Sequence, residues 1–212
     1  MTDKRASLEA ILPAVSRETF DSLVELEAQL KAWNQRINLV SDTTVEDAWQ
    51  RHILDSAQLL ALAPDKESWA DLGSGGGFPG LVVAILLAGR PGALVTLVES
   101  NTRKTAFLHH VVGLLGLPAT IASERIEQAV TARPAPEIVT ARALAPLPKL
   151  LGLAAPWLSA GTRGLFHKGR DYRRELDESA DKFRFDLIEH PSFVDRAGVI
   201  LDVTGFRKRS DP

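Results

Sequence analysis

The residues best suited to chemistry lie in one stretch, Asp71–Gly80, which reads DLGSGGGFPG. Glycine adopts positive φ angles and lets a ligand approach the backbone, because it carries no side chain. Apolar residues precede this stretch and the apolar run LVVAILLA follows it, whereas a flexible linker needs polar surroundings. We therefore expect a ligand-binding loop between a strand that ends at Leu72 and a helix that begins near Pro79.

The glycine spacing alone leaves the ligand open. The loop fits G-x-G-x-x-G, the dinucleotide pattern, from Gly75, and it fits G-x-G-x-G from Gly73. Two carboxylates favour the second pattern. Asp71 stands two residues before the first glycine, and Glu99 ends the next apolar run, where a carboxylate can accept hydrogen bonds from both hydroxyls of a ribose. These groups suit S-adenosylmethionine, which presents an amine and a ribose but no pyrophosphate.

Other common kinds of site have little support. The chain has five histidines and no cysteine, so disulfides and thiolate metal sites are excluded and we expect no metal. No serine, histidine and aspartate show the spacing of a hydrolytic triad. His52 and Asp55 lie three residues apart on one predicted helix face, where they either pack helices together or line the mouth of an active site.

The elements that must position the glycine loop alternate between strand and helix. Apolar and β-branched runs predict strands at 68–72, 93–99, 120–122, 138–142, 164–167, 185–190 and 199–206. Helices are predicted at about 79–89, 102–115 and 147–158. This alternation indicates right-handed crossovers and a largely parallel sheet. Only the short segment Pro191–Gly198 joins the last two strands, which favours an antiparallel pair.

The first 65 residues have the spacing of helices. Apolar residues recur every three or four positions from Phe20 to Ile37, which gives one apolar stripe. A second helix is predicted to begin at Thr43, with Glu46 three residues later as in a capping box, and to end before Pro64.

The charge distribution is uneven. Net charge is −2, so charge alone favours an ordinary solvated surface over one that binds nucleic acid. Residues 1–67 carry 7 Lys and Arg against 12 Asp and Glu, while basic runs that can meet phosphates occur at 167–170, 173–174 and 207–209. The start MTDKRASLEA lacks a signal peptide, and the longest apolar run is far shorter than the roughly 20 residues that span a bilayer. We expect a soluble cytoplasmic protein.

Together these motifs resemble class I S-adenosylmethionine methyltransferases. More narrowly, the chain is similar to the bacterial 16S rRNA (guanine-N7)-methyltransferases, the glucose-inhibited division protein B family, over nearly its whole length. Besides the glycine loop, the matching stretches are Asn38–Val40, Arg51–Ser56, Val98–Ser100, Arg103–Lys104, Phe107–Leu108, Ser123–Glu127, Thr140–Ala143 and His167–Gly169. Arg51–Ser56, which reads RHILDS, is the specific one. The chain departs from the family at Ala141, where serine is usual, and at Glu124, which separates Ser123 from Arg125.

The resemblance implies a Rossmann-like α/β fold with a mostly parallel seven-stranded sheet, an antiparallel C-terminal strand pair and an N-terminal helical extension. We expect residues 1–65 to form that extension, packed on a methyltransferase domain of residues 66–212. The implied reaction transfers a methyl group from S-adenosylmethionine to guanine N7 in the 530 loop of 16S rRNA, free or in the small subunit, by a monomer. The residues alone also admit a nicotinamide-dependent oxidoreductase, or an RNA-binding module with a vestigial pocket.

The residues and the resemblance together give the candidate site. The expected cofactor-binding residues are Gly73, Gly75, Phe78, Glu99, Ile126, Glu127 and Arg142. Guanine N7 carries a lone pair and no hydrogen, so its attack on the methyl group needs no general base and depends on positioning. Arg125 and Lys168 are the candidates for positioning the substrate, at guanine O6 or at a phosphate. Phe78 and Arg142 have plainer alternative roles, core packing and a surface ion pair.

Overall fold

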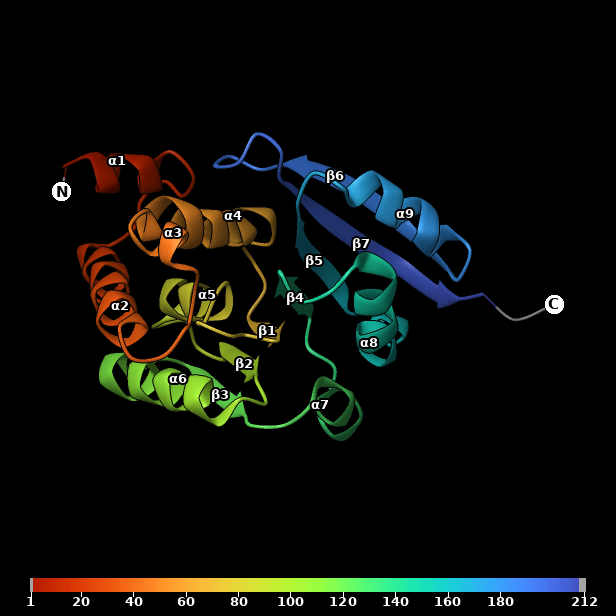
Figure 1. Ribbon diagram of the computed structural model, residues 1–212, viewed down its shortest axis with the longest axis horizontal. Helices are drawn as coiled ribbons and strands as arrows, with labels where there is room; N and C mark the ends of the chain where they lie inside the picture. The colour runs from red at the N-terminus through yellow and green to blue at the C-terminus, as the bar shows by residue number, and fades with distance from the viewer. Residues whose placement is uncertain (1, 210–212) are drawn as a thin grey trace.

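A seven-stranded sheet forms the centre of the computed structural model, which describes residues 2–209 (Figure 1). Its strand order is β3-β2-β1-β4-β5-β7-β6; β1 to β5 run parallel, and β7 is antiparallel to both β5 and β6. The strands are β1 (Ser68–Leu72), β2 (Leu94–Val98), β3 (Ala119–Ala122), β4 (Ile138–Arg142), β5 (Arg163–Lys168), β6 (Phe183–Pro191) and β7 (Val199–Lys208). The predicted strands and the antiparallel C-terminal pair are confirmed.

Helices cover both faces of the sheet (Figure 1). One face carries α1 (Thr2–Glu9), α2 (Arg17–Asn34), α3 (Asp42–Val45), the π-helix η1 (Trp49–Leu54), α4 (Asp55–Leu62), α5 (Gly80–Leu87) and α6 (Thr102–Leu115). The other carries α7 (Ile126–Ala132), α8 (Leu147–Ser159) and α9 (Tyr172–Ala180). Side chains alternate along β1, so Trp69 packs into the first core while Ala70 and Leu72 pack into the second. Because β1 to β4 run parallel, the loops that follow them meet at one edge of the sheet, where ligands of such folds bind.

The second helical segment differs from its prediction. The capping box at Thr43 and Glu46 is wrong, because α3 begins at Asp42 with Ser41 as its N-cap residue. A π-helix then precedes α4, which ends at Leu62. A π-helix often marks a functional segment, because its wider turn redirects side chains and carbonyls. The short helices α7 and α9 are not predicted from the apolar spacing either; α9 reads YRRELDESA, and its large apolar side chains are Tyr172 and Leu176, which pack on the second core.

The helices of residues 2–62 share one continuous apolar core with the sheet and with α5 and α6. The division at residue 65 into an extension and a methyltransferase domain stays a prediction. Within residues 2–209, no helix combines the length and apolar character needed to cross a membrane.

Candidate cofactor and substrate site

The glycine loop between β1 and α5 has the backbone conformation that its composition predicts. Gly73, Gly75 and Gly77 have φ angles of 70°, 55° and 88°, in the region that glycine alone adopts freely. The amides of Gly73 and Ser74 donate to the carbonyl of Val98 at 2.9 and 3.0 Å, which ties the loop to the end of β2. A Cβ added at Gly75 would meet the carbonyl oxygen of Gly73 at 3.7 Å and Lys104 Nζ at 4.0 Å, which are ordinary contacts, so the positive φ angle and not crowding favours glycine here.

Asp71 fixes the loop from inside. Its side chain is fully buried, and its Oδ2 accepts from the amide of Gly80, the first residue of α5, at 3.1 Å. Its Oδ1 has no hydrogen-bond partner among the described residues. Burial raises the pKa of the Asp71 carboxyl to about 6, although the Gly80 amide acts in the opposite direction. The carboxylate therefore caps a helix and is not positioned to contact a ligand directly.

This pKa gives a pH-dependent stability. A carboxyl whose folded pKa is raised from 3.8 to about 6 contributes stability that is present below pH 3.8 and is lost as the pH rises through 6. Asp71→Asn keeps an acceptor for Gly80 but does not ionise. Relative to the wild type, the variant should gain roughly 1 kcal/mol of unfolding free energy between pH 5 and pH 7, as urea denaturation would measure. If the difference in unfolding free energy between the variant and the wild type were the same at pH 5 and pH 7, this would contradict the burial of an ionisable Asp71.

His52→Gln serves as the control of opposite sign. Burial and the adjacent Arg142 lower the pKa of His52 from 6.5 to about 4, so the wild type loses stability as the pH falls through this window. The glutamine variant should therefore gain stability relative to the wild type on going from pH 7 to pH 5.

Two cavities meet at the glycine loop. The small cavity, of about 310 Å³, lies over the ends of β2 and β3. The large cavity, of about 780 Å³, lies between the ends of β4 and β5, the π-helix and the loop that follows β6. Four residues line both cavities, namely Gly73, Gly75, Lys104 and Ala143. A ligand in the small cavity would therefore touch the wall of the large one.

The small cavity brings together most of the predicted cofactor-binding residues. Its lining includes Gly73, Gly75, Glu99, Ile126 and Glu127. The carboxylate of Glu99 accepts from the amide of Gly75 at 3.0 Å and from the amide of Asn101 at 2.7 Å. A carboxylate has about four acceptor positions, so Glu99 keeps two for a ligand. The half-buried side chain of Ile126 offers an apolar wall beside it.

The large cavity is lined by the other two predicted cofactor-binding residues, Phe78 and Arg142. Phe78 is buried, and its ring stacks on that of His52 with centroids 5.0 Å apart and planes at 28°. The guanidinium of Arg142 lies over the same ring, 5.4 Å from its centroid. The side chain of Phe78 thus packs in the core, and only its backbone remains for contact with a cofactor.

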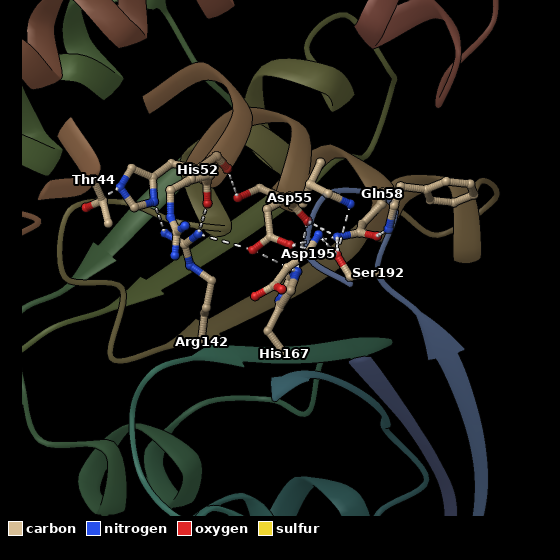
Figure 2. A network of polar contacts seen from close by, with 12 residues as sticks. Thr44, His52, Asp55, Gln58, Arg142, His167, Ser192 and Asp195 are labelled. Atoms are coloured by element: carbon tan, nitrogen blue, oxygen red, sulfur yellow. Dashed lines mark hydrogen bonds and ion pairs between the residues drawn. The ribbon is translucent and has the colours of Figure 1, made fainter. Parts of the chain in front are cut away.

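Arg142 belongs to a polar network that joins β4 to the π-helix (Figure 2). Its Nη1 donates to the carbonyl of Arg51 at 2.7 Å and to Asp55 Oδ2 at 3.3 Å, and its Nη2 donates to His52 Nδ1 at 2.8 Å. The Asp55 amide bonds to the carbonyl of Gln50, five residues back, so the π-helix leaves the Arg51 carbonyl free to accept from Arg142.

The protonation states in this network follow from its donors. Arginine only donates, so His52 Nδ1 is the acceptor and the ring proton sits on Nε2, which donates to Thr44 Oγ1 at 3.2 Å. His167 Nε2 donates to the backbone carbonyl of Asp55 at 2.9 Å, and burial lowers the pKa of His167 as well. Both histidines are therefore neutral at pH 7, and Arg142 with Asp55 forms the charged pair of the network.

The two predicted substrate-positioning residues lie apart. Arg125 lines the small cavity at the start of α7. Lys168 lines the large cavity, but its ammonium is almost buried: it pairs with Glu175 Oε2 at 2.5 Å and donates to the carbonyl of Ala145 at 3.0 Å. The structure thus does not bring Arg125 and Lys168 together, and Lys168 is not an unpaired cation.

Comparison with known proteins decides the family. The model of the GidB family, rRNA small subunit methyltransferase G, matches residues 19–199. This chain belongs to that family. It is 51% identical over 208 residues to ribosomal RNA small subunit methyltransferase G of Chelativorans sp. (strain BNC1), covering 98% of this chain and 99% of the relative. It is 52% identical over 205 residues to the protein of that name from Brucella canis (strain ATCC 23365 / NCTC 10854 / RM-666), covering 97% and 96%.

Solved structures confirm the Rossmann-like methyltransferase fold. A putative O-methyltransferase from Klebsiella pneumoniae matches with a TM-score of 0.60, 11% identity and 96% coverage of both chains. Cofactor-bound Rv0187 from MTB matches with a TM-score of 0.62 and 15% identity, covering 95% of this chain and 96% of that one. At these identities the likeness concerns the fold alone.

Membership of the methyltransferase G family confirms the resemblance, but the network around Arg142 is a finding of the structure. The sequence offers His52 and Asp55 as neighbours on a helix. It gives no sign that Arg142 and His167, which are about 90 and 110 residues away, complete the set. The signal that the sequence does contain is the motif RHILDS, of which Arg51, His52 and Asp55 line the large cavity.

Proposed function

We propose that this protein transfers the methyl group of S-adenosylmethionine to guanine N7 in the 530 loop of 16S rRNA. The observation that supports this most directly is the pair of cavities that share the glycine loop as a common wall. One cavity has the groups that a nucleoside needs, and the other is large, open and lined with cations. Membership of the methyltransferase G family supports the RNA substrate.

The residues of the small cavity fit the proposed cofactor. Glu99 has acceptor positions left for two ribose hydroxyls, Ile126 and Glu127 would flank the adenine, and Gly75 lines the cavity with backbone alone, so a ligand can approach it closely. Bound S-adenosylmethionine supplies an electrophilic methyl group. From the small cavity, its methionine portion would extend along Gly73 towards the large cavity, near the backbone of Phe78 and the end of β4 at Arg142.

The large cavity would hold the guanine. No general base is needed, since N7 attacks with its own lone pair, so the cavity has to orient the base and exclude water. The methylated ring is cationic. Neutral His52 and His167 add no opposing charge, and the charge of Arg142 is balanced by Asp55. Lys168 supports this wall through Glu175 and Ala145, while direct substrate positioning by Arg125 and Lys168 stays a prediction.

One assay tests the function. The protein is incubated with methyl-labelled S-adenosylmethionine and small ribosomal subunits or 16S rRNA that lack the modification, and the label is mapped. We expect incorporation at a single guanine in the 530 loop, with loss of the N7 lone pair detected by chemical cleavage at that base. Binding of NADH in preference to S-adenosylmethionine would instead favour the oxidoreductase. RNA binding without methyl transfer would favour the vestigial module.

A further inference from the structure

An exposed aromatic ring lies in the loop that forms one wall of the large cavity; its neighbours Ser192 and Val194 line the cavity, while the ring itself does not. Phe193 lies in the loop between β6 and β7, residues 192–198, which we call the β6–β7 loop. Its side chain is 73% exposed, the highest value among the large hydrophobic residues that the structure describes. Leaving a phenyl ring in water forgoes the free energy of burial, so such a residue commonly marks a contact surface.

The β6–β7 loop is held in one conformation and not simply left loose. Gln58 Oε1 accepts from the amide of Phe193 at 3.1 Å, and Gln58 Nε2 donates to Asp55 Oδ1 at 2.8 Å. Ser192 Oγ accepts from the amides of Val194 and Asp195, each at 3.2 Å. The loop is thereby joined to the network of Arg142 and Asp55 (Figure 2). The backbone of Phe193 is thus tied to the network that lines the candidate guanine site.

Unpaired cations surround the same cavity. Its lining includes Arg51, Lys104, Arg170 and Arg196, and none of these four forms an ion pair with a described side chain. By contrast, Arg142 and Lys168, which line it too, are paired with Asp55 and Glu175. Arg196 belongs to the β6–β7 loop itself, three residues from Phe193. The cavity lining therefore carries four free cations and two carboxylates without an ion pair among the described residues, Asp171 and Asp195, and the loop that borders it carries the exposed ring of Phe193.

We propose that Phe193 stacks on an unpaired RNA base that neighbours the target nucleotide, while Arg196 and Arg170 contact the phosphates on either side of it. This inference rests on the proposed function. Single-stranded RNA is recognised by this combination, because every base has a π-face and every linkage a negative charge. An apolar protein partner would match Phe193 but not the four cations that line the cavity next to its loop. The stack would hold the strand open and place the target base over the large cavity.

The test compares substitutions at Phe193. Phe193→Ala should weaken binding of unmodified 16S rRNA in a filter assay by about fivefold to a hundredfold, the range expected for loss of one base stack. It should raise the KM for small ribosomal subunits and leave the affinity for S-adenosylhomocysteine unchanged. Phe193→Trp should retain binding, whereas Phe193→Leu, which keeps an apolar side chain without a π-face, should behave like alanine. Ile188→Ala changes another exposed apolar residue, 60% exposed on β6, and is the matched control; its RNA affinity and KM should equal those of the wild type.

Salt dependence separates the ring from the charges. Arg196→Gln should reduce the slope of log affinity against log salt by about 0.7, the value for one contact with a single strand, while Phe193→Ala should leave the slope unchanged. If the wild type neither binds nor methylates the RNA, the proposed function fails. If the wild type is active and Phe193→Ala matches it in RNA affinity and KM, the stacking proposal alone is overturned. Full retention by Phe193→Leu, or a changed oligomeric state in Phe193→Ala, would likewise overturn it in favour of a protein contact.

Discussion

Replacing Arg142 by methionine is expected to lower the free energy of unfolding by about 3 kcal/mol, the lower end of the range for removing one partner of a buried ion pair. The side chain of Arg142 is only 16% exposed, and its guanidinium donates to Asp55, the Arg51 carbonyl and His52 at once. Methionine is long enough to fill much of the space but donates no hydrogen bond. The loss would therefore come mainly from an unpaired buried carboxylate and an unsatisfied carbonyl. Urea denaturation at pH 7 measures it.

Two further variants isolate the cause. Arg17→Met removes the cation of an exposed pair, in which the side chains of Arg17 and Asp21 are 85% and 64% exposed, and should have little effect. Adding Asp55→Asn to Arg142→Met removes the unpaired charge and should recover part of the loss. If Arg142→Met were no more destabilising than Arg17→Met, the guanidinium would not hold this network together. Its role would then lie with the cofactor, as the sequence predicts.

Local patterns account for what the sequence predicts correctly. The strands are short apolar runs bounded by glycine, proline or charge, and β1 with its glycine loop needs only the thirteen consecutive residues 68–80 to be recognised. The place of Glu99 next to the glycine loop follows from its position at the end of β2, because parallel strands bring their carboxyl ends to the same edge as the loop; its contact with a ribose stays a prediction. These inferences depend only on the spacing of apolar and polar residues within a short segment, and the folded protein keeps the local structure that this spacing predicts.

The errors concern features that depend on tertiary contacts. The environment of Lys168 depends on such contacts too: it lies in a basic run of the sequence, and Glu175 of α9 pairs with it, while its role in positioning the substrate stays a prediction. Thr43 and Glu46 have the spacing of a capping box, yet the chain enters α3 one residue earlier and then forms a π-helix. That π-helix frees the Arg51 carbonyl to accept from Arg142, the last residue of β4. No local pattern encodes a donor and acceptor that are about 90 residues apart.

Glu99→Ala is expected to weaken binding of S-adenosylhomocysteine by at least about tenfold, which corresponds to 1.4 kcal/mol. Two hydrogen bonds from ribose hydroxyls to a carboxylate are worth roughly 1.5–3 kcal/mol each before water compensates for their loss. The substitution also releases the amides of Gly75 and Asn101, so the glycine loop loses part of its support. Glu99→Gln should bind S-adenosylhomocysteine nearly as weakly, because its side-chain NH₂ group would point at a backbone amide, and two donors cannot form a hydrogen bond. Isothermal titration calorimetry measures both variants.

Glu124→Ala provides the matched control, since Glu124 lines the same cavity but engages Arg133 at 2.9 Å. It should bind S-adenosylhomocysteine like the wild type. This result would show that the loss of any negative charge from this cavity does not by itself weaken binding. Thermal unfolding without ligand must confirm that Glu99→Ala is folded at the temperature of the titration. An affinity within twofold of the wild type in folded Glu99→Ala would remove Glu99 from the ribose site. Tighter binding of NADH than of S-adenosylmethionine by the wild type would reject the cofactor itself, because the spare acceptor positions of Glu99 would then serve a dinucleotide.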